Sequence, residues 1–400
     1  MLLTPSNFHR AGGFASWMHL CCCQNTCTRT TLDIGLNNGG LWVADYSTTA
    51  KQGKIDASTL ATSTTWAEDV FGNGVERGLR VGYGGSAAYY LTQSPSGGTI
   101  YGNLVSVNTS TGAANWGNFG AGLRYFTTGG VDSSAGVAVG GYDDSYGSLG
   151  NGGAIVLAVN SSTGATIDYH PNFGMEGSLR AGDVAADGYW HYCSAVWPGG
   201  GGSGTKTRLL LQKVWFDTGT NSLTQAISGA WGGAFGIGEG HYADDLSGPG
   251  GGGEAIYRIR LADSGATIYA TCSAVVGATI LKIDASDGSL QASANPGYSV
   301  ISGNTSGCVP LSVSGSAVYA GGSLNTSGDT YEVVWSYSTD LSTQNWALEL
   351  NKVTGENNPA CLGLELSGGY LYAVVQCPTQ EGYVTILKID PSDGSIVAQA

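Results

Sequence analysis

TILKIDASDGSL, residues 279–290, decides the fold, because nearly the same twelve residues return as TILKIDPSDGSI at 385–396. In both copies, apolar and polar residues alternate up to the aspartate, which is the pattern of a half-buried β-strand. Asp-x-x-Asp-Gly or its proline-containing variant follows, and it supplies side-chain caps and a residue that tolerates a positive φ in a tight turn. Each copy therefore predicts a β-hairpin.

Related hairpins recur along the chain at nearly even spacing. Subtraction gives intervals of 52, 52, 55, 69, 53 and 53 residues between turns at Asp56, Asn108, Asn160, Trp215, Asp284, Tyr337 and Asp390. Trp215 and Tyr337 depart from the Asp/Asn pattern, and Leu60 and Leu341 replace the turn glycine. A register that centres the sixth turn on NKVTG is rejected, because it makes the intervals uneven.

A second hairpin with small and aromatic residues precedes each of these turns. The seven copies lie near Trp42, Tyr89, Val137, Trp190, Tyr269, Tyr319 and Tyr372. Each repeat then has four strands, A to D, in about fifty residues, which is the size of a propeller blade. We predict an all-β protein: a seven-bladed β-propeller of four-stranded antiparallel blades over residues 30–400, preceded by an irregular N-terminal arm at 1–29.

The amino-acid composition agrees with an all-β fold and limits the kinds of binding partner. Charged residues make up only 12% and there are 66 glycines, which suits short strands joined by turns and suits helices poorly. A net charge of −14 with 16 Lys plus Arg argues against nucleic acid and anionic membrane as partners. No apolar run is long enough for membrane insertion, and Pro5, Asn7, His9 and Arg10 interrupt any signal-peptide core.

The repeat resembles that of the quinoprotein-type (PQQ-like) β-propellers, whose signature is Ala-x-Asp-x-x-Thr-Gly-x-x-x-Trp. SVNTSTGAANW matches it best, with Asn108, Thr111, Gly112 and Trp116 at the family spacing. The resemblance implies that Trp116 packs between neighbouring blades, and we expect core roles for Trp66 and Trp346 as well. It also implies a cofactor site with a vicinal disulfide and acidic calcium ligands, but the only adjacent cysteines lie in the arm, so we expect a degenerate relative without cofactor.

The cysteines allow several interpretations. Cys21, Cys22, Cys23 and Cys27 lie in the arm and could hold a metal, although zinc sites normally need a second pair of ligands. Disulfides or free thiols are the alternatives we favour. Cys308 and Cys361 each stand eleven residues before a strand-B tyrosine of adjacent blades, so they could form a disulfide if their geometry permits.

The long, non-repeating segments fall on one face of the predicted propeller. The short A–B and C–D turns share one face, and the variable B–C and D–A connections share the other, where binding residues usually gather. These connections are Gln93–Gly102, Tyr142–Gly153, Pro198–Lys206, Ile227–Gly253 and Asn351–Ala360. We call this the loop face.

The insertion Ile227–Gly253 accounts for the one long interval. Its notable residues are Trp231, Phe235, Glu239, His241, Tyr242, Asp244 and Asp245. Aromatic rings beside carboxylates suit a carbohydrate or protein contact, and such carboxylates could also chelate calcium. The alternative is a loop whose aromatic residues only cover the blade edge. Asp143 and Asp144 lie on the same face and could contribute.

Arginines recur where strand A is expected to begin. They are Arg80, Arg124, Arg180 and Arg258, with Arg29 as a fifth candidate, and Glu76, Glu176 and Glu254 precede three of them by four residues. A ring of arginines at a channel mouth could grip a carboxylate or phosphate. The alternative, which we favour, is that each arginine pairs with its glutamate or caps carbonyls between blades.

No catalytic motif is recognisable among the five scattered histidines, and we assign no catalytic residue. The leading hypothesis is a non-catalytic binding or structural propeller on an extracellular assembly or virion, such as a tail or fibre. It would serve adhesion by contacting a surface glycan or a neighbouring protein subunit. The alternative is a secreted or periplasmic propeller enzyme, either quinoprotein dehydrogenase-like or a polysaccharide lyase or glycosidase acting through Glu239 and Asp244.

Overall fold

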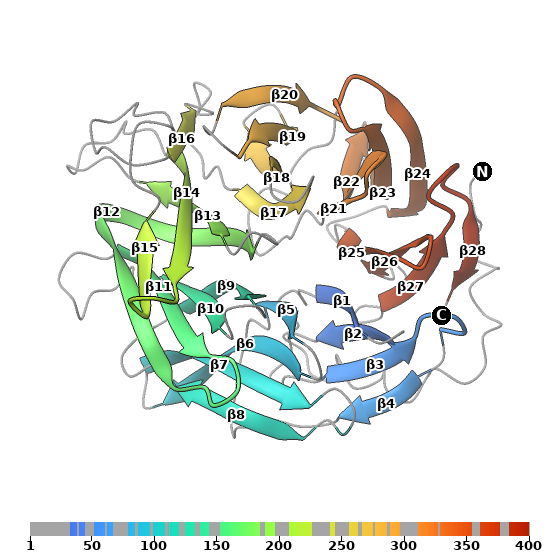
Figure 1. Ribbon diagram of the computed structural model, residues 1–400. Coiled ribbons are helices and arrows are strands. Elements are labelled where there is room, and N and C mark those ends of the chain that lie inside the picture. The colour runs from blue at the N-terminus through green and yellow to red at the C-terminus, as the bar shows by residue number, and fades with distance from the viewer. Residues whose placement is uncertain are drawn as a thin grey trace.

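A computed structural model shows a ring of antiparallel β-sheets (Figure 1). It describes residues 33–37, 40–44, 52–60, 62–66, 79–84, 87–96, 99–108, 111, 113–119, 125–132, 137–143, 153–184, 189–196, 208–225, 241–244, 256–262, 266–274, 277–285, 289–296, 311–326, 329–353, 361–376 and 384–399. Every regular element in these ranges is a strand. The all-β prediction is therefore confirmed.

Five sheets have four strands each, in the order of the chain. The first two comprise β1 (Asp33–Asn37), β2 (Gly40–Ala44), β3 (Gln52–Asp56) and β4 (Thr62–Trp66), then β5 (Leu79–Gly84), β6 (Ala87–Ser96), β7 (Thr99–Asn108) and β8 (Ala114–Phe119). The last three comprise β17 (Ile256–Ala262), β18 (Thr267–Ala274), β19 (Gly277–Asp284) and β20 (Leu290–Ala294); β21 (Leu311–Val313), β22 (Ala317–Thr326), β23 (Asp329–Ser338) and β24 (Gln344–Val353); and β25 (Cys361–Ser367), β26 (Tyr370–Gln376), β27 (Val384–Ile389) and β28 (Ile396–Gln399).

A sixth, larger sheet lies between the second and third of these. It comprises β9 (Tyr125–Asp132), β10 (Val137–Asp143), β11 (Gly153–Asn160), β12 (Thr166–Val184), β13 (Tyr189–Val196), β14 (Arg208–Asp217), β15 (Ser222–Gln225) and β16 (His241–Asp244). The first half of β12 pairs with β11 and its second half with β13. Interpreting this sheet as two blades joined by one long strand gives seven blades, and that count stays a prediction.

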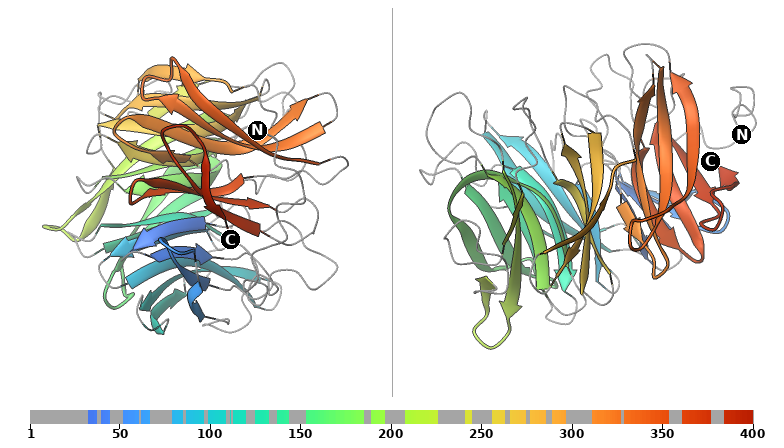
Figure 2. Two further views of the ribbon diagram at one scale, coloured as in Figure 1. Left: turned by 90° about the vertical axis from the view of Figure 1, so that its right-hand side faces the viewer. Right: turned by 90° about the horizontal axis from the view of Figure 1, so that it is seen from above.

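The ring closes through the innermost strands. β1 contacts β5, β5 contacts β9, β9 and β17 contact β12, β17 contacts β21, β21 contacts β25, and β25 returns to β1. Figure 2 shows the sheets packed against their neighbours around this ring. The core lies between the sheets: one buried cluster joins the β17–β20 and β21–β24 sheets through Tyr269, Ile280 and Trp335, and the next joins β21–β24 to β25–β28.

The predicted C–D turns are present, and an Asp, Asn or Ser side chain caps five of them: Asn108, Asn160, Asp217, Ser338 and Asp390. Asn160 Oδ1 accepts hydrogen bonds from the amides of Ser162 and Thr163, and Gly164 closes the turn at φ 71°. In the fourth turn the cap is Asp217, two residues after the aligned Trp215, and Asn221 has the positive φ of 53°. The sixth turn closes on Ser338 rather than Tyr337, and Leu341 has φ 60°.

The sixth turn should make stability depend on pH. Ser338 Oγ donates to Asp340 at 2.5 Å, and the Ser342 amide and hydroxyl also donate; these bonds lower the pKa of Asp340 to about 2. A lowered carboxyl pKa contributes stability above the ordinary value of about 3.8, and that contribution is lost as pH falls toward about 2. Asp340→Asn should therefore be less stable than the wild type at pH 6, with the difference shrinking at pH 2. Denaturant unfolding at both pH values measures this, and a difference independent of pH would contradict it.

Two sheets dock onto the next sheet through a tryptophan of the outer strand. Trp116 on β8 donates its indole N–H to the Ser161 carbonyl at 2.9 Å, and Trp346 on β24 donates to Pro391 at 2.9 Å. Each ring lies on the turn glycine of the next sheet: a Cβ on Gly164 would be 2.4 Å from Trp116, and one on Gly394 would be 2.7 Å from Trp346. The predicted packing role is thus confirmed for these two residues.

Trp66 does not occupy the equivalent position. Trp116 and Trp346 pair across from Ser106 and Ser336, two residues before the turn cap. In the first sheet that register position belongs to Thr64, opposite Lys54, and Trp66 lies two residues further along β4. The degenerate turn at Leu60 obscures this offset in the sequence. The expected core role of Trp66 stays a prediction.

Two other junctions use a tyrosine of the second strand instead. Tyr269 Oη donates to the Thr339 carbonyl at 2.6 Å, and Tyr372 Oη donates to the Ala57 carbonyl at 2.6 Å, which joins the last sheet to the first. These acceptors directly follow Ser338 and Asp56, the last strand residues before their turns, as Ser161 and Pro391 follow Asn160 and Asp390. At each of these junctions, the backbone carbonyl at the same turn position accepts a hydrogen bond from either an indole N–H or a phenol O–H.

The size of the residue on the outer strand differs between the tryptophan and the tyrosine junctions. Strand registers place Tyr319 level with Ser336 and Trp346, but Tyr269 level with Lys282 and Ala292, and Tyr372 level with Lys388 and Ala398. Where the outer strand has alanine, the next turn has leucine in the left-handed region: Leu341, 5% exposed, or Leu60, 1% exposed. Buried leucine therefore fills the space that tryptophan fills elsewhere, and this offsets the backbone strain.

Candidate functional site

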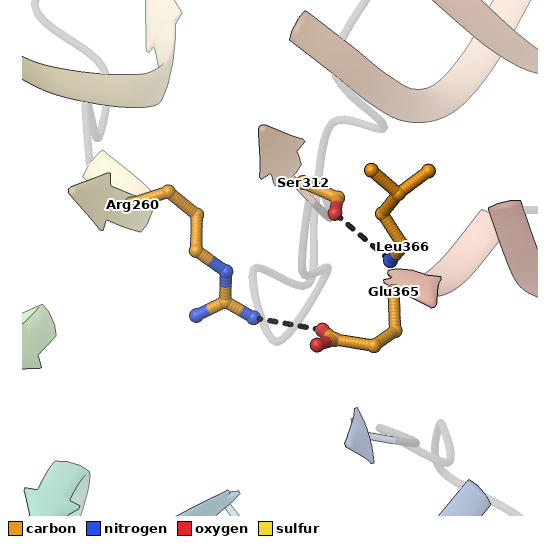
Figure 3. A network of polar contacts seen from close by, with 4 residues as sticks. All are labelled: Arg260, Ser312, Glu365 and Leu366. Atoms are coloured by element: carbon orange, nitrogen blue, oxygen red, sulfur yellow. Dashed lines mark hydrogen bonds and ion pairs between the residues drawn. The ribbon is translucent and has the colours of Figure 1, made fainter. Parts of the chain in front are cut away.

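The described polar side chains in the middle of the ring come from three innermost strands. Arg260 on β17 and Glu365 on β25 form an ion pair with Nη2 and Oε2 3.7 Å apart, across the end of β21 (Figure 3). Ser312 on β21 accepts a hydrogen bond from the Leu366 amide at 3.1 Å, which fixes β25 beside β21. β21 has only three residues, so the pair connects two sheets that are not neighbours in the chain.

The three residues lie at one level of the ring, because each pairs with a second-strand tyrosine at the same position relative to the A–B turn. Arg260 pairs with Tyr269, Ser312 with Tyr319, and Glu365 with Tyr372. At the same register position, β1, β5 and β9 have Gly35, Gly82 and Gly130. At this level, β17, β21 and β25 therefore have polar residues, whereas β1, β5 and β9 have glycine.

The insertion contributes a strand to the sheet edge. His241, Tyr242 and Asp244 lie on β16, which pairs with residues Leu209–Gln212 of β14, while β15 pairs with the other half of β14. β16 thus lies at the end of β14 that follows the long connection Pro198–Lys206, the end predicted to lie on the loop face. Trp231, Phe235 and Asp245 lie outside the described residues, as does Asp144.

The predicted loops are shorter than expected in places. β6 and β7 extend to Ser96 and from Thr99, so most of Gln93–Gly102 is paired strand rather than loop. β24 similarly continues to Val353 within Asn351–Ala360. The sequence obscured this because Pro95 and neighbouring glycines suggest a turn, whereas Pro95 is accommodated in the hairpin opposite Ile100.

Three of the predicted arginines lie in innermost strands, next to irregularities in the pairing of these strands with their neighbours. The register shifts between Leu79 and Gly82 around Arg80, between Leu179 and Ala181 around Arg180, and between Ile256 and Arg258. Bulges of this kind redirect side chains and often occur near binding sites. Arg124 and Arg29 lie outside the described residues, and the arginine ring stays a prediction.

The cysteine predictions fall largely outside the described residues. Cys21, Cys22, Cys23, Cys27 and Cys308 are not described, while Cys361 is the first residue of β25, paired with Val375. The proposed Cys308–Cys361 disulfide therefore stays a prediction.

The described side chains do not fit the metal set that the resemblance implies. Within the described ranges, no group of three or more His, Cys, Asp or Glu residues could hold a metal ion. At the level of the central ion pair, the described side chains offer one carboxylate, Glu365, next to a guanidinium. Calcium takes six to eight oxygen ligands, and a neighbouring cation opposes its binding.

The central ion pair was missed by sequence reasoning. Arg260 lies two residues after Arg258, within β17 rather than at the start of the strand, where the other predicted arginines recur. Glu365 is one polar residue in the apolar run CLGLEL. Comparing strand A at the position opposite each strand-B tyrosine would have found both residues.

Comparisons with known proteins agree with this architecture. No protein-family model matches the chain. No curated protein matches it. A europium-containing methanol dehydrogenase is similar in structure with a TM-score of 0.53 and 10% identity, covering 93% of this chain and 79% of that one.

Two further solved structures show the same likeness. The quinohemoprotein alcohol dehydrogenase of Comamonas testosteroni has a TM-score of 0.51 and 11% identity over 92% of this chain and 66% of that one. The WD40 repeats of RRP9 have a TM-score of 0.52 and 10% identity over 93% and 94%. No helix that could span a bilayer occurs in the described part of the chain. The chain therefore has the β-propeller fold, and it is similar to quinoprotein dehydrogenase and WD40 propellers.

Proposed function

We propose that this propeller is a non-catalytic binding module, displayed on an extracellular assembly or virion such as a tail or fibre. It contacts a glycan or a protein partner through the loop face. The observation that supports this most is the asymmetry of the two faces. Five C–D turns are capped by a short polar side chain on one face, whereas the one large insertion adds β16 at the opposite end of β14.

The composition of β16 fits such a contact. His241, Tyr242 and Asp244 lie within the four residues of an edge strand, so a phenol, an imidazole and a carboxylate occur close together in the chain. Aromatic rings and carboxylates are the groups that bind sugar faces and hydroxyls. The chain's low charge suits a neutral glycan better than a polyanion.

Replacing His241 and Asp244 together with alanine should weaken binding to a glycan array at least about tenfold, since each lost charged hydrogen bond costs about 1.5–3 kcal/mol. Asp393→Asn is the matched control, because Asp393 is an exposed turn residue whose carboxylate accepts the Ser395 amide on the other face. Equal binding by both variants would contradict a role for β16. Fractionation tests display: recovery only as a free monomer would contradict the assembly part.

The second candidate is a propeller enzyme of quinoprotein dehydrogenase or polysaccharide-cleaving type. The likeness to two quinoprotein dehydrogenases supports testing it, although their identity to this chain is only 10–11%. Titration of the purified chain with calcium and pyrroloquinoline quinone would distinguish the candidates. A redox-active absorbance or turnover of an alcohol or polysaccharide would replace the binding proposal.

A further inference from the structure

Two hairpins between second and third strands are the longest that the structure describes. β6 and β7 have ten residues each, as do β22 and β23, and both hairpins are paired up to a two-residue turn. They begin at the same level, because Ala87 lies opposite the turn cap Asn108, and Ala317 lies opposite the turn cap Ser338. Ile100 near the tip of the first hairpin therefore corresponds to Thr330 in the second.

The outer edge of the hairpin tip is covered in one of these sheets and open in the other. In the β21–β24 sheet, β24 continues to Val353, which pairs with Thr330. In the β5–β8 sheet, the pairing of β8 with β7 ends with Phe119 opposite Asn103. Within the described ranges, no strand pairs with residues 99–102 of β7 on that side (Figure 1).

The chain that follows β8 is too short to cover this edge. Residues 120–122 would have to continue along β7 to reach the level of Ile100, and three Cα steps would then remain before Tyr125 at the start of β9. Three steps span at most about 11 Å. The outermost and innermost strands of a four-stranded sheet are already about 14 Å apart, so an occupant of this edge has to come from elsewhere.

Pro95 shows which backbone groups the open edge presents. Pairs in an antiparallel ladder alternate between those that exchange both hydrogen bonds and those that exchange none. Pro95 lies opposite Ile100 and has no N–H, so their pair is of the second kind. The N–H and C=O of Ile100 therefore point away from β6, toward the open outer edge.

The inner edge of the same hairpin is protected. Within the described ranges, β5 pairs with β6 no further than Leu91, so the tip beyond it is a two-stranded ribbon. Pro95 offers no donor on this inner edge, and proline is one of the devices that prevent strand addition at a sheet edge. The ribbon thus has one edge that can accept a further strand.

We propose that residues 99–102 of β7 pair antiparallel with the same residues of a second copy of this chain, about a two-fold axis. The covered edge of the β21–β24 sheet indicates the kind of occupant, which is an antiparallel strand. The segment TIYG has three residues of high strand propensity and no charge, so two copies of it can lie side by side without opposing like charges.

The geometry of the ribbon also limits the assembly to two copies. A two-stranded ribbon is only marginally stable by itself, and pairing of two ribbons gives a four-stranded sheet. Each copy uses its one open edge in the contact, because Pro95 blocks the other. The dimer does not involve β16, so it is independent of the proposed glycan contact.

The test is sedimentation equilibrium of the purified full chain. We expect the average mass to rise from one chain toward two with a Kd on the order of 10 µM, since a four-residue strand pair is a small interface. Ile100→Pro should raise this Kd at least about tenfold, because it removes a donor that faces the second copy. Its melting temperature should match that of the wild type, because no bond between β6 and β7 is lost.

Charge replacement at the same position gives a second test. Ile100→Lys and Ile100→Glu should each be monomeric, because like charges would lie opposite or diagonal to each other across the two-fold axis, and an equimolar mixture of the two should dimerise. Thr330→Lys is the matched control: it changes the corresponding position on an edge that Val353 already covers, so it should dimerise like the wild type.

Three results would overturn the dimer. They are a wild-type chain that stays monomeric at about ten times the expected Kd, an Ile100→Pro variant that dimerises as tightly as the wild type, and a Lys and Glu mixture that dimerises no better than either variant alone. The variant with alanine at 241 and 244 should dimerise normally. A failed dimer with intact glycan binding, or the reverse, therefore separates the two proposals.

Discussion

Replacing Trp346 with alanine and Gly394 with leucine in one chain is expected to destabilise the protein less than the two single replacements together. Trp346→Ala alone should cost about 3 kcal/mol, since it empties a half-buried site. Gly394→Leu alone should cost about 3 kcal/mol or more, because its Cβ would lie 2.7 Å from the Trp346 ring and its φ is 77°. The combined variant recreates the arrangement of Ala398 and Leu60.

Leucine in the double variant fills the space that the indole leaves, so the two changes should couple by about 2–3 kcal/mol. Unfolding in guanidinium chloride gives the four free energies of the cycle. Gly368 is the matched control position: its φ is 55°, but nothing lies within 4 Å of an added Cβ. The losses of unfolding free energy from Gly368→Leu and Trp346→Ala should therefore be additive. If the losses from Gly394→Leu and Trp346→Ala are additive as well, leucine at 394 does not fill the space of the indole.

Tyr372→Phe is expected to lower the free energy of unfolding by about 2 kcal/mol and to loosen the junction between the last and first sheets. The phenol donates to the Ala57 carbonyl at 2.6 Å, and an acceptor left without that donor in a partly buried junction costs about 1–3 kcal/mol. Lys388 Nζ also donates to this carbonyl, but its hydrogen bond is much longer, at 3.5 Å, and does not replace that of the phenol.

Hydrogen exchange locates the effect. Amides of β1–β4 and β25–β28 should exchange faster in Tyr372→Phe, because opening of this junction frees both end sheets together. Tyr337→Phe is the control, since Tyr337 Oη donates to Gln344 Oε1 at 3.0 Å within one sheet. Faster exchange confined to β26 and β27, or the same pattern in both variants, would argue that Tyr372 does not hold the ring closed.

The fold could be predicted because its determinants are local and repeated. Alternation in TILKID and the cap-and-glycine turn specify a hairpin within twelve residues, and the recurrence of this hairpin at even spacing predicts a propeller without reference to any long-range contact. The errors came where local signals were degenerate. Leu60 in a left-handed conformation does not look like a turn residue, because burial, at 1% exposure, offsets the strain of this conformation.

The central pair shows a different limit. Arg260 and Glu365 are 105 residues apart, by subtraction of their numbers, and each looks like an ordinary polar strand residue. Their meeting depends on the ring bringing β17 and β25 to either side of the short β21. No local pattern reports the curvature of a ring, so a sequence could indicate which strands are innermost but not which of their side chains face each other.

The two kinds of junction also limit how such a chain could have changed its copy number. If the β21–β24 repeat alone were duplicated, Trp346 would meet Leu341 of the new copy, and the junction would be overfilled. If the β25–β28 repeat alone were duplicated, Ala398 would meet Gly394, and the junction would be hollow. Duplication of both repeats as a unit sets Ala398 against Leu341 and Trp346 against Gly394, so both new junctions stay matched. Growth or loss by pairs is therefore compatible with this packing, whereas a single added repeat requires compensating substitutions in its neighbour.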